Sequence, residues 1–143
     1  MDILGVMNIG SSGLRAQTIR LNTISSNLAN IETTRTPEGG PYRKKSAVFT
    51  TESTGFEAHL EQGRPQTAQG VSVQYIRTDN GPGKMVYDPS HPDSDENGYV
   101  EKPNINLAEE MTDMIRARGS YEANVTAIKS AQRMAMKALE IGR

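Results

Sequence analysis

The hydrophobic residues of this chain repeat every seven positions near both ends and lose that period in the middle. Near the N-terminus one row holds Met7, Leu14, Leu21 and Leu28, and a second row includes Ile3, Ile24 and Ile31. Near the C-terminus one row holds Leu107, Met114, Tyr121, Ile128 and Ala135, and a companion row holds Met111, Val125 and Leu139. Apolar residues spaced three and four apart form a stripe along a helix that needs a partner helix. The pattern predicts an N-terminal helix within 1–31 and a C-terminal helix within 104–143, paired as a coiled coil.

Local signals refine both predicted helices. Gly10 and Gly13 each weaken the first helix by about 1 kcal/mol relative to Ala, but they also let another helix approach closely. Pro103 ends whatever precedes the second helix, and Asn106 with Glu109 forms a start that resembles a capping box. About 35 residues at ~1.5 Å each give a rod of ~50 Å, which is long for a compact domain of this size.

The middle segment, 32–103, contains all seven prolines and no heptad period. Short β-prone runs at 42–50, 71–78 and 84–87 predict a small sheet with long irregular flanks. The sequence Asp-Asn-Gly-Pro-Gly at 79–83 favours a hairpin turn between the last two runs. The region 53–69 is predicted to be disordered. The expected fold is therefore mainly α, with a small β part between two long terminal helices.

Composition sets limits on what this chain does. Only 26 of the 143 residues are Leu, Ile, Val or Phe, so the chain is too poor in large apolar groups to bury a good core alone, and we expect association to complete it. The net charge of −1 gives no reason to expect binding to nucleic acid. The lack of cysteine excludes disulfides and thiolate chemistry. The chain shows neither a membrane-spanning run nor a cleavable signal at its start, so we expect either a cytoplasmic protein or export by a route that cleaves no signal.

One segment resembles a ligand site. The sequence DSDENG at 93–98 matches the first six positions of an EF-hand calcium loop, but Asn104 stands where the bidentate Glu should be. Prolines at 89 and 92 prevent a helix from leading into it. A polar turn explains the segment more simply, and a calcium-responsive binding module stays the alternative function.

The remaining residues offer no catalytic, cofactor or metal site. The sequence around Lys84 lacks the spacing and hydroxyl of a phosphate-binding loop. His59 and His91 are the only histidines, too few for a structural zinc site without cysteine. The basic run at 43–45 is interpreted as a solvated strand end. We therefore expect a protein that is not an enzyme and has no small-molecule substrate.

Several motifs are similar to a known family. The run SNLAN at 26–30 followed by Thr33 resembles the N-terminal signature of bacterial flagellar rod and hook proteins. More narrowly, TPEGGPYRKK at 36–45, DPSHP at 88–92 with NGYV at 97–100, and YEAN at 121–124 resemble proximal-rod members of that family. Gly119 stands where those members often have Arg, which places a possible bend in the second helix. A secreted helical adaptor of a virulence-type injection apparatus is a weaker alternative.

The resemblance implies a structural subunit of the proximal rod that leaves the cell through the flagellar type III export gate and assembles in the periplasm. It implies contacts with copies of itself, with the rod proteins FlgB, FlgF and FlgG, with the adaptor FliE and with the membrane-ring protein FliF. It also implies a helical shaft that transmits torque and encloses the export channel. The residues expected to carry assembly are Met7, Leu14, Leu21, Ile24, Asn27, Leu28, Asn30, Met111, Met114, Tyr121, Val125, Ile128 and Leu139.

Overall fold

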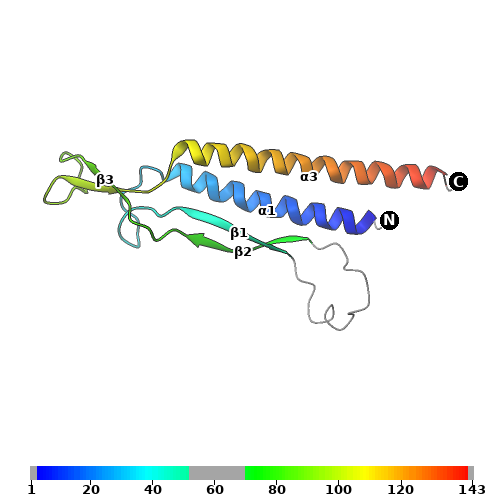
Figure 1. Cartoon of the computed structure of the whole chain (residues 1–143), viewed down its shortest axis with the longest axis horizontal. Coiled ribbons are helices and arrows are strands. Elements are labelled where there is room, and N and C mark those ends of the chain that lie inside the picture. The colour runs from blue at the N-terminus through cyan, green and yellow to red at the C-terminus, as the bar shows by residue number, and fades with distance from the viewer. Residues whose placement is uncertain (1–2, 52–69, 142–143) are drawn as a thin grey trace, which may run out of the picture.

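The computed structural model describes residues 3–51 and 70–141 and shows an elongated molecule built on two helices (Figure 1). Helix α1 (Ile3–Ala29) and helix α3 (Leu107–Ile141) lie side by side and run in opposite directions, so both termini lie at one end. The predicted fold class, two long terminal helices with a small β part, is confirmed. Neither helix has an apolar stretch long enough to cross a membrane.

The seam of α3 against α1 differs from the predicted one in its second row. Met114, Tyr121 and Ile128 of the first row are half-buried, although Leu107, which begins that row, is 53% exposed. In the second row Met111 is 52% and Leu139 76% exposed. The row that completes the seam instead contains Glu110, Ala117, Asn124 and Ala131, of which Glu110, Ala117 and Ala131 are buried. The prediction chose the larger apolar residues, whereas the close approach of the helices selects small and hydrogen-bonding ones.

Glycine on α1 permits that close approach, as the sequence predicts. A Cβ atom at Gly10 would lie 2.6 Å from Cγ1 of Ile128, and one at Gly13 would lie 2.8 Å from the side-chain nitrogen of Asn124. Both distances are shorter than any normal contact between such atoms. The helix that approaches these glycines is the chain's own α3.

Two separate antiparallel sheets replace the single predicted sheet. Strands β1 (Lys45–Thr51) and β2 (Val71–Thr78) pair with a bulge between Val48 and Phe49, and both strands pack on α1. In Figure 1 they lie on the side of α1 away from α3, so α1 is the middle layer. Strands β3 (Lys84–Tyr87) and β4 (Tyr99–Lys102) pair beyond the start of α3.

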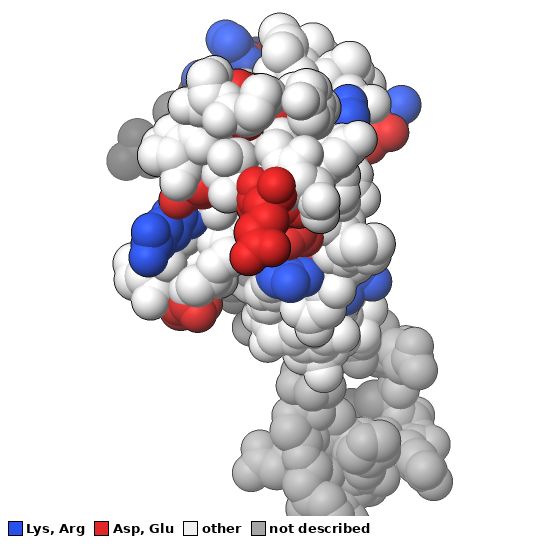
Figure 2. All heavy atoms as spheres, turned by 90° about the vertical axis from the view of Figure 1, so that its left-hand side faces the viewer, with Lys and Arg blue, Asp and Glu red and all other residues white. Residues whose placement is uncertain are grey.

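The β3–β4 sheet forms the tip of the molecule. Figure 2 looks at this tip and shows a mostly uncharged surface with a group of acidic side chains near its middle. The only large apolar side chain buried there is Val100, at 1% exposed. The tip is thus a thin sheet with one covered face and one face open to solvent.

The predicted hairpin at 79–83 is wrong, because the two strands that it joins do not pair. The backbone N–H of Asp79 bonds to the carbonyl of Lys44 and extends the β1–β2 ladder. The N–H of Gly83 bonds to the Glu101 carboxylate, and a Cβ at Gly83 would meet the Lys102 carbonyl at 2.6 Å. The segment therefore carries the chain from one sheet to the next. The sequence prediction missed β4. Residues 53–69, predicted to be disordered, lie outside the described residues.

Helix α3 starts as expected and continues through Gly119. The Asn106 side chain accepts a hydrogen bond from the Ala108 N–H at 3.0 Å, as an N-cap residue does. Apart from the adjacent residues and the backbone of α3 itself, no described atom lies within 4 Å of the position that a Cβ on Gly119 would take.

Replacing Gly119 therefore tests helix propensity without packing effects. We expect Gly119→Ala to raise the free energy of unfolding by about 1 kcal/mol, since Ala loses less backbone entropy in a helix and meets no neighbour. Urea unfolding followed by circular dichroism measures the change. A loss of stability would mean that this part of α3 is not helical in solution.

Candidate assembly site and its buried polar cluster

The junction of α1, β1 and α3 holds a cluster of polar side chains around Asn27, which is 1% exposed. Its amide nitrogen donates to the Lys45 carbonyl at 2.8 Å and to the Glu110 carboxylate at 3.0 Å. Its amide oxygen accepts from the Lys45 N–H at 2.9 Å and from the Tyr42 hydroxyl at 3.2 Å. All four hydrogen-bonding positions of the amide are used, which explains why Asn suits this position. We call Asn27, Tyr42, Lys44 and Glu110 the Asn27 cluster.

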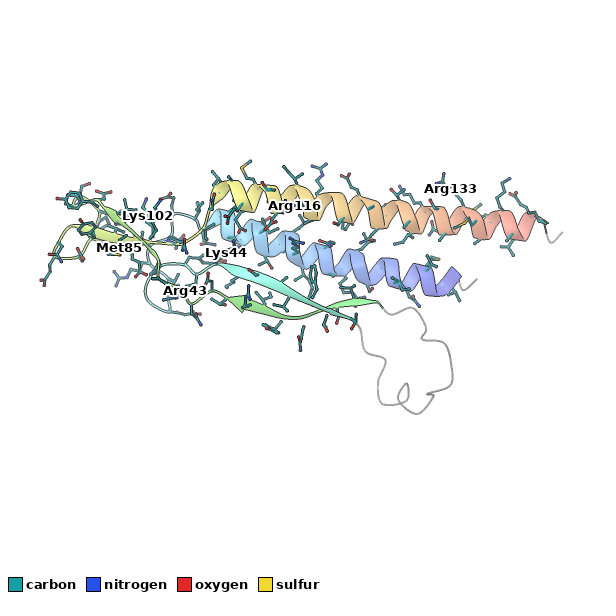
Figure 3. The ribbon with its side chains drawn as sticks, viewed as in Figure 1. Arg43, Lys44, Met85, Lys102, Arg116 and Arg133 are labelled. Carbon is teal, nitrogen blue, oxygen red and sulfur yellow. The ribbon has the colours of Figure 1, made fainter. Side chains whose placement is uncertain are left out.

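Glu110 brings a carboxylate into the seam, where it is 1% exposed. Its second oxygen lies 2.7 Å from the Lys44 ammonium, and the Lys44 side chain is 25% exposed. Figure 3 shows Lys44 where the chain leaves the helix pair to form β1. A buried charge is tolerated when it is paired and hydrogen-bonded, and Glu110 has both kinds of partner. The ion pair joins the start of β1 to the first turns of α3.

Hydrogen bonding to Glu110 raises the pKa of Lys44 above its usual value, an effect that the carboxylate charges of Glu110, Glu109 and Asp113 reinforce and that partial burial opposes. A pKa that is higher in the folded than in the unfolded chain gives stability that is complete below the unfolded value, near 10.5. That stability is lost as pH rises through the folded value.

We therefore expect the free energy of unfolding to fall more steeply above pH 10.5 in the natural chain than in Lys44→Met. Urea titrations between pH 8 and pH 11.5 measure the two slopes. Equal slopes would show that the ion pair does not persist in solution.

The second asparagine of the SNLAN run ends α1. The Asn30 side chain donates to the Ser26 carbonyl at 2.9 Å, and its amide oxygen accepts from the Thr33 hydroxyl at 3.2 Å. The Thr33 carbonyl then accepts from the Tyr42 N–H at 3.0 Å. Asn30 thus closes the turn after α1 through a backbone and a side-chain hydrogen bond, whereas Asn27 bonds across elements.

The carboxylates of segment 93–98 make hydrogen bonds and an ion pair within the protein. The Asp95 side chain accepts from the backbone N–H groups of Asn97 and Tyr99. The Asp93 side chain accepts from the Thr34 hydroxyl at 2.8 Å and lies 3.7 Å from Arg35. Gly98 has a φ of +83°, a value that favours glycine in this turn. Within the described residues no three His, Cys, Asp or Glu side chains are placed to hold a metal ion, so the geometry gives the calcium module no support.

The residues predicted to carry assembly are distributed over the seam and the surface. Ile24 and Asn27 are buried; Met7, Leu14, Leu21, Leu28, Asn30, Met114, Tyr121, Val125 and Ile128 are half-buried; Met111 and Leu139 are exposed. Sequence reasoning missed Glu110 and mistook Lys44 for part of a solvated strand end. The sequence did carry a signal for Glu110, because it lies seven residues before Ala117 and so belongs to the same heptad row as the small residues Ala117, Asn124 and Ala131.

Comparison with known proteins matches both helices to flagellar families. A family described as flagella basal body rod protein matches residues 7–35, and one described as flagellar basal body rod FlgEFG protein C-terminal matches residues 96–141. The flagellar basal-body rod protein FlgC of Borreliella burgdorferi is 44% identical, over 99% of this chain and 98% of its own length. FlgC of Bacillus subtilis is 41% identical over 96% of each chain, and FlgC of Salmonella typhimurium is 36% identical over the full length of both.

The chain belongs to the FlgC family of flagellar basal-body rod proteins. It is a structural subunit of the basal-body rod, as the sequence motifs predict. The two matched segments of this rod protein contain Asn27 and Glu110, which the fold brings into contact. Lys44, the counter-charge, lies between the two matched segments.

Proposed function

We propose that this rod protein acts by assembly alone, without catalytic activity. Its neighbours in the helical tube are copies of itself, the rod proteins FlgB, FlgF and FlgG, the adaptor FliE and the membrane-ring protein FliF. The tube stands in the periplasm, carries torque from the ring outward and encloses the export channel. The chain reaches it through the flagellar type III export gate, with no cleaved signal.

One observation carries the proposal: the described chain buries very few of its large apolar side chains and leaves fifteen of them exposed. Among the described residues, Ile24 and Val100 are the only large aliphatic side chains that are buried, and the other buried apolar residues are three alanines, two prolines and Tyr42. Fifteen large hydrophobic residues are exposed, among them Leu4 at 73%, Ile115 at 71% and Ile141 at 84%. Burying one such side chain is worth roughly 1.5–3 kcal/mol, so neighbours that cover them contribute strongly to assembly.

The exposed residues suggest which surfaces meet neighbours. Helix α3 has eight residues more than α1, and its last turns carry Met136 and Leu139, which are 63% and 76% exposed. Seam residues such as Leu21 and Ile128 act through the helix pair that presents these surfaces. Surfaces that differ from the ones they meet produce open helical tubes, the architecture of a rod.

Substitution of Leu139 tests this proposal. We expect Leu139→Asp to abolish incorporation into the basal body and swimming, because a charge on the exposed end of α3 opposes its burial by a neighbour. The helix signal of the purified chain should change little, since the side chain is mostly in water. The measurement is the amount of chain in isolated basal bodies of a motile bacterium that uses this chain as its rod subunit.

Gln132→Asp, which places the same charge at another exposed position of α3, is the matched control and should incorporate normally. The amount of each variant outside the cytoplasm separates export from assembly. Normal rods with Leu139→Asp would exclude the end of α3 as an assembly surface.

A further inference from the structure

Two of the nine asparagines in this chain, Asn80 and Asn97, are followed by glycine. Glycine has no Cβ atom, so its backbone nitrogen can approach the side chain of the preceding asparagine more closely than the nitrogen of any other residue. Attack of that nitrogen on the amide carbon is a route by which asparagine loses ammonia, and asparagine is counted among the thermolabile residues. Both sequences therefore have the composition of a deamidation site, and the structure distinguishes between them.

The turn at 95–98 holds the Asn97-Gly98 sequence in place. The Gly98 N–H donates to the Asp95 carbonyl at 3.0 Å, and the Gly98 carbonyl accepts from the Asp88 N–H at 2.9 Å. The N–H of Asn97 donates to the Asp95 carboxylate, also at 2.9 Å. The backbone on both sides of the Asn97 side chain is thus fixed by hydrogen bonds. The Gly98 nitrogen would have to leave its turn before it could attack the amide.

The Asn80-Gly81 sequence lies in the segment that connects β2 to β3 and has no regular secondary structure (Figure 1). Asn80 is exposed. The Gly81 N–H donates to the Asp79 carboxylate at 2.9 Å, and the Gly81 carbonyl accepts from the Arg43 guanidinium at 3.1 Å. Both partners are exposed side chains, and backbone held by exposed hydrogen bonds opens more readily than the rest of a fold.

Asp79 has the position of a general base. Its carboxylate accepts a hydrogen bond from the Gly81 N–H, the group that loses its proton when the nitrogen attacks, and a base needs a distance of about 2.6–3.2 Å for this task. The N–H of Asp79 itself donates to the Lys44 carbonyl at 2.8 Å, so the end of the β1–β2 ladder keeps the carboxylate in place. At the other sequence the Gly98 N–H donates to a backbone carbonyl, which is not a base.

We propose that Asn80 is a site of self-catalysed deamidation, with the Asp79 carboxylate as its general base. Asp79 takes the proton of the Gly81 N–H while the nitrogen forms a bond to Cγ of Asn80. The bond between Cγ and Nδ2 then breaks, and Nδ2 leaves as ammonia with the proton that Asp79 returns. Water opens the five-membered imide at one of its two carbonyls and leaves aspartate or isoaspartate at position 80.

Either product changes the connection between the two sheets. Both add a carboxylate next to Asp79, and isoaspartate also adds one carbon to the backbone. The segment 79–83 carries the chain from the sheet beside α1 to the tip. Deamidation therefore alters the attachment of the tip without breaking the chain, and it needs only water as a reactant. The reaction does not depend on assembly.

Incubation of the purified full chain at neutral pH, followed by digestion and mass spectrometry, measures conversion at both asparagines in one sample. We expect Asn80 to convert about ten times faster than Asn97, because Gly98 must first give up hydrogen bonds of about 1 kcal/mol each. In guanidinium chloride the unfolded chain should convert both at similar rates. Equal rates in the folded chain, or the same large difference in the unfolded one, would overturn the proposal.

The variant Asp79→Ser tests the base, because a hydroxyl can still accept from the Gly81 N–H but takes up no proton at neutral pH. We expect conversion at Asn80 to slow by about threefold or more, which is less than a base contributes in a closed site. Glu96→Ser, which removes the exposed carboxylate directly before Asn97, is the matched control and should leave both rates unchanged. An unchanged or faster rate at Asn80 in Asp79→Ser would overturn the role of Asp79 as the base.

Discussion

Lys44→Ala is expected to destabilise the chain by about 3 kcal/mol, because it leaves the Glu110 carboxylate buried without its counter-charge. This lies at the low end of the range for breaking a buried ion pair, since Lys44 retains some contact with water. A small core makes such a loss a large fraction of the total stability. Urea unfolding monitored by circular dichroism measures it, and the helix signal at 25 °C should already be reduced.

Two comparisons separate the ion pair from a general loss of positive charge. Lys45→Ala removes the neighbouring lysine, which is exposed and has no buried carboxylate beside it, and should change stability by less than about 1 kcal/mol. Lys44→Met combined with Glu110→Gln removes both charges and keeps a side-chain oxygen at position 110 that can accept the hydrogen bond from the Asn27 amide nitrogen. The double variant should recover most of the loss, as neutral replacements of buried ion pairs often do. If Lys44→Ala and Lys45→Ala were equally mild, the pair would contribute nothing to folding.

The terminal helices were predictable from the sequence because their signal is local and periodic. Pro103 and Asn106 placed the start of α3 within one residue of where it lies, and the row of Met114, Tyr121 and Ile128 gave the side that packs on α1. The family followed from short motifs in the same way. What those motifs do physically did not follow, since the role of Asn27 depends on groups 18 and 83 positions away.

The second row of the seam and the strand pairing were not predictable by the same reasoning. Heptad counting favours large apolar residues, so it selected Met111 over Glu110, although the cost of burying Glu110 is offset by Lys44 and Asn27. The turn at 79–83 has a hairpin composition, but strand partners are fixed by tertiary contacts, so the pairing of β3 with the unrecognised β4 could not be read from that turn. Reasoning from local sequence fails at both places because the contacts that determine the structure come from segments distant in the sequence.

Gly10→Leu is expected to push the two helices apart. Leu has a better helix propensity than Gly by almost 1 kcal/mol, so an isolated helix would gain stability. In the folded chain even its Cβ would lie 2.6 Å from Ile128, and the remaining carbons have no free space against α3. Overpacking of this kind costs about 1–3 kcal/mol, more where backbones must move apart, so we expect a net loss of about 2 kcal/mol and no assembly into rods.

The reciprocal change identifies the cause. Ile128→Ala alone should also destabilise the chain, because it leaves a cavity beside Gly10. In the double variant the leucine at position 10 fills the cavity that Ile128→Ala leaves. The double variant should therefore lose less stability than the sum of the two single losses. Additive losses in urea unfolding would mean that Gly10 and Ile128 do not face each other. A recovery confined to this pair, and absent when Gly10→Leu is combined with Ile115→Ala on the outer face of α3, would establish the antiparallel register of the helices in solution.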